Sequence, residues 1–202
     1  MLAIIDYGAG NLQSVKKALQ FIGETVEITS DTKTIERADG VLLPGVGSFG
    51  DVMHSMRKRG LVDCVRALAD GSRPFLGICL GLQLLFAHSD ESPEAVGLDV
   101  LPGEVLRIPQ MGLKVPHIGW NAITLQRHDG VFVDVPNDVY VYFVHSFYVK
   151  AGDIDLVAAQ TRYGVTIDAA VTKGLLTATQ FHPEKSGDAG LQMLRNFAIL
   201  TR

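Results

Sequence analysis

The sequence has no excess of positive charge. Its 18 Lys and Arg residues are outnumbered by 22 Asp and Glu residues, which gives a formal net charge of −4 at pH 7. Proteins that bind nucleic acids need a basic surface to neutralise phosphates. A nucleic-acid partner is therefore not expected.

Long apolar runs and an export signal are also lacking. No run approaches the roughly 18 residues that a membrane-spanning helix requires. The opening MLAIIDYGAGN has no basic segment of the kind that begins a signal peptide, and it predicts a first strand instead. We expect no membrane partner and a cytoplasmic location.

Cysteine is scarce, because the chain has only Cys64 and Cys79. Two cysteines do not suggest a disulfide framework in a chain of this size, so both are expected to be free thiols in a reducing compartment. The spacings typical of zinc sites, such as C-x-x-C and H-E-x-x-H, are absent. We expect no metal ion and no cofactor.

The first half alternates short apolar runs with stretches of helical period. Strand-like runs occupy residues 2–5, 25–29, 40–43 and 74–78, and helical periodicity fills residues 12–22 and 52–68. This order predicts a parallel sheet with helices on both faces.

The second half is richer in turn residues and short strands. Residues 139–149, 155–160 and 175–181 have strand composition, and residues 187–200 form an amphipathic helix pattern. With no repeat or linker in 202 residues, we expect a single domain, residues 1–202. The predicted fold class is α/β, a three-layer and mostly parallel central sheet with flanking helices and antiparallel additions in the second half.

Gly77-Ile78-Cys79-Leu80-Gly81 has the G-x-S-x-G form of a nucleophile elbow, with sulfur in place of the serine oxygen. A sharp strand-to-helix turn leaves no room for side chains two residues either side of the nucleophile. A helix running on through Leu82, Leu85 and Phe86 would stabilise a thiolate at its N-terminus. The alternative is that Cys79 is a small buried core residue, which is the interpretation we adopt for Cys64.

A thiolate nucleophile needs a base, and the base needs an orienting group. Of the six histidines, His182 stands in QFHPEKSG, where Glu184 follows after a proline. The motif is weak alone, since a histidine before proline is more often a turn residue. The order Cys79, His182, Glu184 is nevertheless what an α/β enzyme with a nucleophile elbow requires.

A competing motif is GVGSFG at residues 45–50, which matches G-x-G-x-x-G. It follows the third strand instead of the first, and Pro44 interrupts the turn, so dinucleotide binding is the minority interpretation. We favour a loop whose backbone N–H groups hold an oxyanion.

Together, PGVGSFGD, GICLGLQLLF, VPHIGWN, YFVHSFYV and QFHPEKSG give the chain a close resemblance to the class I glutamine amidotransferases. IDYGAGN, VPHIGWN and HPEKS are most similar to the glutaminase subunits of imidazole glycerol phosphate synthase. The resemblance covers essentially the whole chain.

The resemblance implies that L-glutamine is hydrolysed to glutamate and ammonia. By that match Cys79 forms a thioester, His182 transfers protons and Glu184 orients His182. The oxyanion donors would be Val46, Gly47 and the N–H of Leu80.

The same match assigns further residues to the substrate and to a partner. Substrate contacts are implied for Gly45, Gln83, Glu91, His145, Ser146 and Phe147. A solvated helix face for Gln83, a loop acid for Glu91 and a core histidine for His145 remain alternatives. An interface is implied for Trp120, Asn121, Tyr142 and Lys185, although Trp120 could equally be a core residue.

The implied partner is a cyclase subunit that resembles a (β/α)₈ barrel and forms a heterodimer with this chain. It would receive the ammonia for histidine biosynthesis, and its ligand would switch on the glutaminase through the loop at Val46. Three alternatives stay open: the glutaminase subunit of another synthase (pyridoxal phosphate, anthranilate or GMP), an unrelated cysteine hydrolase, or a non-catalytic binding module.

Overall fold

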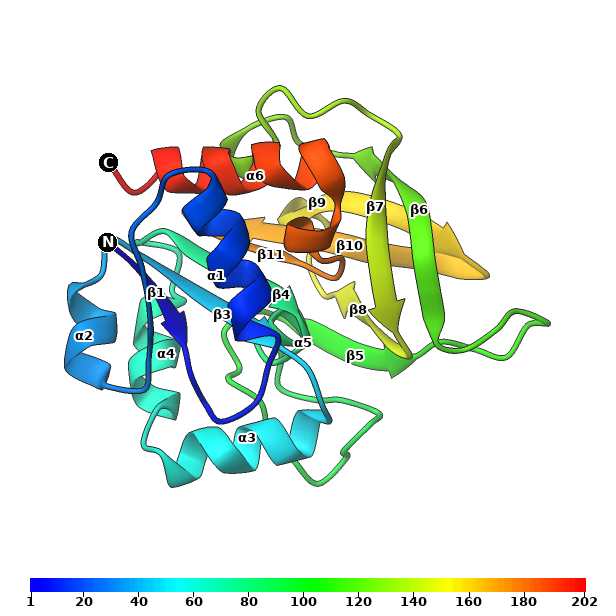
Figure 1. The fold of residues 1–202 in the computed structure, drawn as a ribbon. Helices are drawn as coiled ribbons and strands as arrows, with labels where there is room; N and C mark the ends of the chain where they lie inside the picture. Colours follow the sequence, from blue (N-terminus) through cyan, green and yellow to red (C-terminus); the bar gives the residue numbers. More distant parts are fainter.

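One sheet of nine strands runs through the molecule, and helices cover both faces of its parallel half (Figure 1). The computed structural model describes residues 1–202. The strand order is β2-β1-β3-β4-β11-β10-β9-β6-β7, and a separate two-stranded sheet pairs β5 with β8.

The strands of the large sheet are β1 (Leu2–Ile5), β2 (Val26–Thr29), β3 (Gly40–Gly45), β4 (Phe75–Cys79), β6 (His117–Leu125), β7 (Val139–His145), β9 (Val157–Tyr163), β10 (Val165–Lys173) and β11 (Leu176–Thr179). The small sheet contains β5 (Gly103–Arg107) and β8 (Phe147–Ala151). The α-helices are α1 (Leu12–Phe21), α2 (Thr32–Arg37), α3 (Phe49–Lys58), α4 (Val62–Leu68), α5 (Leu80–Gln83) and α6 (Gly187–Ile199). Single 3₁₀ turns occupy η1 (Gly130–Phe132), η2 (Ile154–Leu156) and η3 (Pro183–Lys185).

The parallel half of the sheet consists of β2, β1, β3, β4 and β11. β1, β3, β4 and β11 are buried at every residue. Continuous burial is what a parallel strand needs when helices cover both faces. Their apolar runs therefore form the centre of the molecule.

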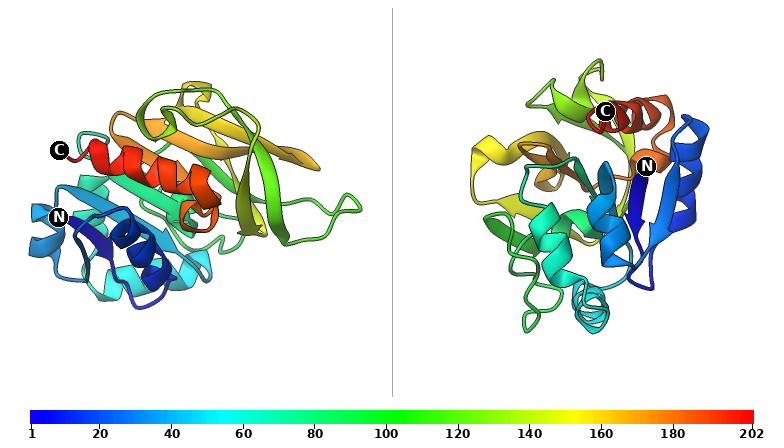
Figure 2. Two further views of the ribbon diagram at one scale, coloured as in Figure 1. Left: turned by 45° about the horizontal axis from the view of Figure 1, so that its top comes forward. Right: turned by 90° about the vertical axis from the view of Figure 1, so that its left-hand side faces the viewer.

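Alternate side chains of β1 divide the core into two layers. Leu2 and Ile4 pack in the cluster that includes Val15 of α1 and Phe197 of α6. Ala3 and Ile5 face the other way, into the cluster that includes Met53 of α3 and others from α2 and α4. Figure 2 shows α1 and α6 on one face and α3 and α4 on the other. The predicted three-layer α/β fold is confirmed.

The second half adds β10, β9, β6 and β7 as antiparallel strands, which was also expected. In β6 and β7 one face carries exposed residues such as Ile118, Trp120 and Tyr140. Antiparallel strands tolerate one solvated face. This part of the sheet is therefore open on one side.

Two predicted elements are each divided in two in the structure. The helical pattern of residues 52–68 is two helices, because α3 ends at Lys58 and the chain turns at Gly60, whose φ is 67°. The strand pattern of residues 139–149 breaks at Ser146, and its two parts join different sheets. The spacing of apolar residues cannot predict such a break, because the segments before and after it have the same apolar spacing.

No helix has the length and apolar character needed to cross a membrane.

Candidate active site

Cys79 ends β4 and directly precedes α5, with a φ of 56° and a ψ of −111°. This positive φ is the strained backbone of a nucleophile elbow. The flanking glycines are required by contact: a Cβ on Gly81 would lie 1.8 Å from the carbonyl oxygen of Leu43, and one on Gly77 would lie 2.9 Å from the Cβ of Ala178. The elbow predicted from the sequence is therefore present.

The helix after the elbow is shorter than predicted. α5 ends at Gln83, and the residues that follow, including Leu85 and Phe86, form turns instead of a continued helix. A single turn supplies unpaired N–H groups but not the dipole of a long helix. Stabilisation of a thiolate must then come from the other groups around the sulfur.

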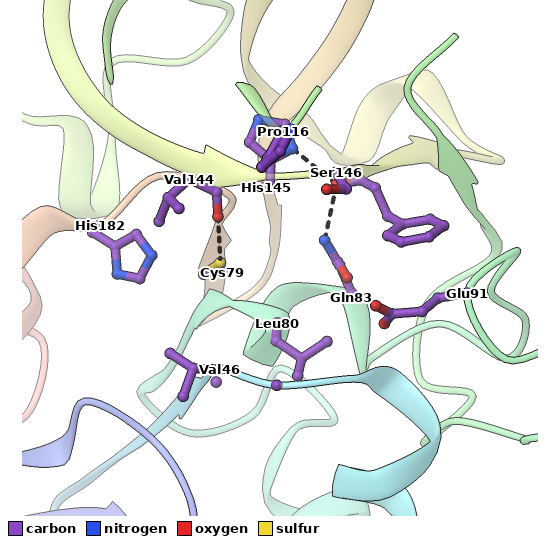
Figure 3. A pocket seen from close by; sticks show the side chains of 13 residues that line it. Val46, Cys79, Leu80, Gln83, Glu91, Pro116, Val144, His145, Ser146 and His182 are labelled. Carbon is purple, nitrogen blue, oxygen red and sulfur yellow. Dashed lines mark hydrogen bonds between the residues drawn. The ribbon is translucent and has the colours of Figure 1, made fainter. Parts of the chain in front are cut away.

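A cavity of about 320 Å³ opens beside Cys79 (Figure 3). It is lined by Gly45, Val46, Gly47, Cys79, Leu80, Gln83, Glu91, Pro116, Val144, His145, Ser146, Phe147 and His182. All the residues that the sequence assigned to the oxyanion and to the substrate are in this set, together with two of the three catalytic candidates. The third candidate, Glu184, does not line the cavity but contacts the ring of His182.

His182 and Glu184 form a buried pair. Nδ1 of His182 lies 2.8 Å from Oε1 of Glu184, and the two side chains are only 3% and 1% exposed. Pro183 starts the 3₁₀ turn η3, which brings the carboxylate back to the ring. Burial lowers the pKa of His182, but hydrogen bonding and charge from Cys79 and Glu184 outweigh it and raise this pKa to about 9.

The ring nitrogen of His182 that faces away from Glu184 is free for chemistry. Nε2 is buried and has no hydrogen-bond partner, although Cys79 is close enough to contribute to the raised pKa of His182. The ring of His182 and the sulfur of Cys79 are therefore neighbours without a formed hydrogen bond. A base that tightens onto its nucleophile only with substrate bound is common in unliganded enzymes.

The sulfur itself has two polar neighbours. Sγ lies 3.9 Å from the carbonyl oxygen of Val144 and 3.7 Å from Nε2 of Gln180. Cys79 is 8% exposed, and it borders the cavity. The thiol is therefore accessible from the cavity and is not sealed in the core.

The loop from Gly45 to Gly47 lies directly against the elbow. Gly45 pairs with Cys79 in the register of β3 and β4, and a Cβ on Gly45 would lie 2.6 Å from the N of Gly81. Gly47 has a φ of 107°, which favours glycine. The hydroxyl of the buried Tyr7 donates to the carbonyl of Pro44 at 2.9 Å and holds the start of this loop.

Tyr7 explains part of the IDYGAGN motif. Its ring is fully buried, and burial raises the pKa of its hydroxyl to about 12. The neutral hydroxyl therefore remains a hydrogen-bond donor at physiological pH. Nothing in the residue pattern around Tyr7 predicts this contact.

Three of the substrate candidates, Gln83, His145 and Phe147, form a hydrogen-bonded set at the wall of the cavity (Figure 3). The carbonyl of Phe147 accepts from Nε2 of Gln83 at 3.0 Å and is 2.8 Å from Nδ1 of His145. Gln83 also donates to Oε1 of Gln180 at 3.1 Å. Gln83 is 4% exposed, so the alternative of a solvated helix face is wrong.

Glu91 and Ser146 border the same cavity. Oε2 of Glu91 accepts from the backbone N of Phe49 at 2.7 Å, at the start of α3. The carbonyl of Ser146 accepts from the N of Ile108 at 2.9 Å. Both segments are thus held by the backbone of neighbouring elements, which fixes the shape of the cavity wall.

His145 has a partner that the sequence analysis missed. Nδ1 of His117 lies 3.0 Å from Nε2 of His145, and the His117 ring stacks between Phe143 and Tyr163. Because the Phe147 carbonyl can only accept, Nδ1 of His145 carries its proton and Nε2 accepts from His117. Burial lowers the pKa of each ring to about 4, so both are neutral at physiological pH.

Three of the four interface candidates, Trp120, Tyr142 and Lys185, gather on the open face of β6 and β7. Trp120 is 55% exposed and lies edge-on to its cross-strand neighbour Tyr142, with ring centroids 6.2 Å apart. Nζ of Lys185 stands 5.7 Å from the centre of the Tyr142 ring. Asn121 points to the opposite face of β6, where it is half-buried and donates to the carbonyl of Arg162 at 3.1 Å. The alternative of Trp120 as a core residue is therefore wrong.

No group of three or more His, Cys, Asp and Glu side chains is arranged to hold a metal ion.

This fold, with a cysteine at a nucleophile elbow and a buried His and Glu pair beside it, defines a class of enzyme. The family model described as Glutamine amidotransferase class-I matches residues 3–201, and the chain belongs to that family. A solved structure described as a crystal structure of glutamine amidotransferase shares the fold, with a TM-score of 0.76 and 22% identity over 98% of each chain.

Two relatives narrow the family further. The imidazole glycerol phosphate synthase subunit HisH of Moorella thermoacetica is 48% identical over 100% of this chain and 95% of its own length. The protein of the same name from Methanothermobacter thermautotrophicus is 48% identical over 100% of both chains. Within the class-I amidotransferases, the chain is thus one of the HisH group.

Proposed function

We propose that this chain is the glutaminase subunit of imidazole glycerol phosphate synthase. It hydrolyses L-glutamine to glutamate and ammonia, and the ammonia passes to a cyclase subunit for histidine biosynthesis. The family match and the full-length relatives support the activity. The single observation that carries the site assignment is that Cys79 and His182 line one cavity, with Glu184 bonded to the ring.

In the proposed reaction, Sγ of Cys79 attacks the carboxamide carbon of glutamine after its proton has passed to Nε2 of His182. The tetrahedral intermediate collapses when His182 returns a proton to the nitrogen, which leaves as ammonia and gives a thioester. A water molecule then attacks the thioester, and His182 takes its proton and returns it to sulfur as glutamate leaves. Glu184 holds the ring in one orientation and stabilises the imidazolium form.

The negative oxygen of each tetrahedral intermediate would be held by backbone N–H groups of Val46, Gly47 and Leu80. One such donor typically contributes about 3 kcal/mol to the transition state. Val46 and Gly47 are on a loop next to the elbow, and Leu80 follows the nucleophile directly. An elbow enzyme requires donors at these two places, directly after the nucleophile and on a neighbouring loop.

The substrate would occupy the rest of the cavity, whose volume suits one small polar molecule. Glu91 has one oxygen bound to Phe49, and its other oxygen is the candidate for the α-ammonium group. Oε1 of Gln83 is available to the substrate, because only its Nε2 bonds to Phe147 and Gln180. Gly45, Val46, His145, Ser146 and Phe147 complete the wall.

The partner would be a barrel-like cyclase subunit that forms a heterodimer through the face carrying Trp120, Tyr142 and Lys185, together with Asn121 on the other side of β6. Ammonia released to water would be protonated and lost as a nucleophile, so a closed path to the partner is an advantage. Val144 is a residue of β7, which pairs with β6, and it also lines the cavity. The proposed docking face therefore borders the active-site cavity. We further propose that the 202 residues act as one domain in the cytoplasm, where Cys64 and Cys79 remain reduced.

The test separates ammonia production from ammonia use. In the assembled synthase, Cys79→Ala should abolish glutamine-dependent synthesis and leave synthesis from added ammonium salts intact. Cys64→Ala is the matched control and should leave both intact. Glutamine-dependent turnover by Cys79→Ala at the parent rate would disprove the assignment, and loss of the ammonium-dependent reaction would point to a failure of assembly.

A further inference from the structure

Gln180 is a fully buried polar side chain that contacts the sulfur of Cys79. It follows β11, two residues before His182, and its exposure is 0%. Its Nε2 lies 3.7 Å from Sγ, and its Oε1 lies 3.1 Å from Nε2 of Gln83. A buried amide needs partners for both of its ends, and here one partner is the reacting atom.

The hydrogen-bond network fixes which end of the amide faces the sulfur. The carbonyl of Phe147 can only accept, so the group of Gln83 that contacts it must be the NH₂ group. The second hydrogen of that NH₂ group then points to an acceptor, which must be Oε1 of Gln180. The NH₂ group of Gln180 is therefore directed at Cys79. The main-chain carbonyl of Phe147 thus determines the direction of donation from Gln83 to Gln180 and from Gln180 to Cys79.

The thiol form of Cys79 has its own partner. Its S–H group has the carbonyl of Val144 as an acceptor at 3.9 Å. A thiolate has no hydrogen to donate and gains from a donor instead. The two neighbours thus favour opposite protonation states, because Val144 stabilises the thiol and Gln180 stabilises the thiolate.

We propose that Gln180 stabilises the reactive thiolate by donating a hydrogen bond to Sγ, and that it couples the position of Gln83 to the state of the sulfur. The inference rests on the proposed role of Cys79 as the nucleophile. A neutral amide suits this position, since it supplies a donor without placing a second charge in a buried site. It also compensates for the short helix α5, whose single turn provides little dipole.

The charged and titratable groups around the sulfur are unaltered by a change at Gln180. They are His182, which is paired with Glu184, and Tyr7, which is bonded to Pro44 at the start of the oxyanion loop. His145 and Glu91 line the cavity. A change in the pH dependence of the sulfur after substitution of Gln180 would therefore report the lost donor.

The test measures how fast iodoacetamide alkylates Cys79 as a function of pH, read by peptide mass spectrometry in the full chain. Gln180→Met keeps the length of the side chain and removes the donor. Gln180→Asn keeps a neutral amide but withdraws it by one methylene, and it is the second variant should the first fold poorly. In both, the pH midpoint of alkylation should move upward by about half a unit to one unit.

Gln160→Met is the matched control. Its amide donates to Asp168 at 2.9 Å, outside the cavity, and the midpoint should not move. A purely structural role for Gln180 would lower the melting temperature without shifting the midpoint, and that result in the folded variants would overturn the proposal. Alkylation needs no glutamine, so the outcome is independent of whether the proposed glutaminase activity is correct.

A second readout uses catalysis. For Gln180→Met the turnover number with glutamine should fall about three- to tenfold at pH 7 and approach that of the parent as the pH rises. An equal loss at every pH would contradict a role in stabilising the thiolate.

Discussion

Three histidines around the cavity have pKa values displaced in opposite directions. The pKa of His182 is raised to about 9, chiefly through its contacts with Cys79 and Glu184 acting against burial. Those of His117 and His145 are lowered to about 4, chiefly by burial. An unfolded histidine titrates near 6.5, so each residue makes stability depend on pH.

The free energy of unfolding changes with pH in opposite directions below and above pH 6.5. Below it, the unfolded chain protonates His117 and His145 before the folded chain does, so stability falls as the pH falls toward 4. Above it, the folded chain keeps the proton of His182 longer, so the stability from that residue is lost as the pH rises toward 9. The free energy of unfolding should therefore be highest between these limits, near pH 6.5.

Denaturant unfolding between pH 5 and 9 tests this pH dependence of stability. By pH 5, His117 and His145 together should lower the free energy of unfolding by on the order of 2 to 4 kcal/mol. His117→Phe, which keeps an aromatic ring between Phe143 and Tyr163, should flatten the acid side of the profile. His128→Gln, at an exposed position, is the control and should not. A parent profile that rises steadily toward pH 5 would contradict the assigned neutral pair.

At the scale of elements, the elbow is the part most tightly constrained by its neighbours. Gly81→Ala would place a Cβ 1.8 Å from a backbone oxygen of β3, which no side-chain rotation can relieve. We expect a loss of about 2 to 3 kcal/mol of stability, or failure to fold, and loss of glutaminase activity. Gly60→Ala is the control, because it has a positive φ but nothing within 4 Å, and it should cost about 1 kcal/mol and keep activity.

Equal melting temperatures for the two glycine variants would show that crowding at the elbow is not what requires Gly81. Calorimetry of both proteins and a glutaminase assay at one temperature are sufficient to decide.

The elbow and the HPE segment could be predicted from the sequence because their chemistry is local. Glycines two residues either side of Cys79, and a proline between His182 and Glu184, leave few backbone paths. The division of residues 52–68 at Gly60 and the break at Ser146 could not be predicted, because the apolar pattern continues across both. Gln180 and His117 were missed for another reason: their partners, Cys79 and His145, are distant in sequence, and only the strand pairing brings them together.

The molecule as a whole is asymmetric. The cavity is lined from both halves of the sheet, by the ends of the parallel strands β3 and β4 and by the end of the antiparallel strand β7 (Figure 1 shows these strands). Val144 belongs to β7 and to the cavity, so the open face of β6 and β7 begins next to it. Exposed apolar side chains on this face include Ile118, Trp120 and Tyr140. An apolar face next to a cavity that must retain ammonia is a suitable docking surface.

Trp120→Ala should weaken binding of the cyclase subunit by roughly 30-fold, since an exposed tryptophan central to an interface typically contributes about 2 kcal/mol. The measurement is titration calorimetry with the purified cyclase. Phe21→Ala, which removes another exposed aromatic ring on α1, should leave the affinity unchanged. If both variants bind like the parent, the docking surface lies elsewhere.

The isolated chain should turn over glutamine slowly, and the cyclase with its ligand bound should raise the rate at least tenfold. The physical reason is that the N–H groups of the oxyanion loop must point at the transition state. The Tyr7 hydroxyl holds the start of this loop through the Pro44 carbonyl, so the loop needs the partner in order to rearrange. Steady-state assays with and without the partner provide the comparison. Equal rates would remove the proposed switch.

Covalent labelling with a glutamine-like electrophile tests the central claim most directly, because it asks which sulfur is the nucleophile. Peptide mass spectrometry should find one label per chain, on Cys79, with glutamine slowing its appearance and His182→Ala reducing it strongly. Cys64, half-buried on α4, should remain unlabelled. Labelling of Cys64 in preference to Cys79, or labelling of Cys79 that neither glutamine nor His182 affects, would contradict a catalytic sulfur at this elbow.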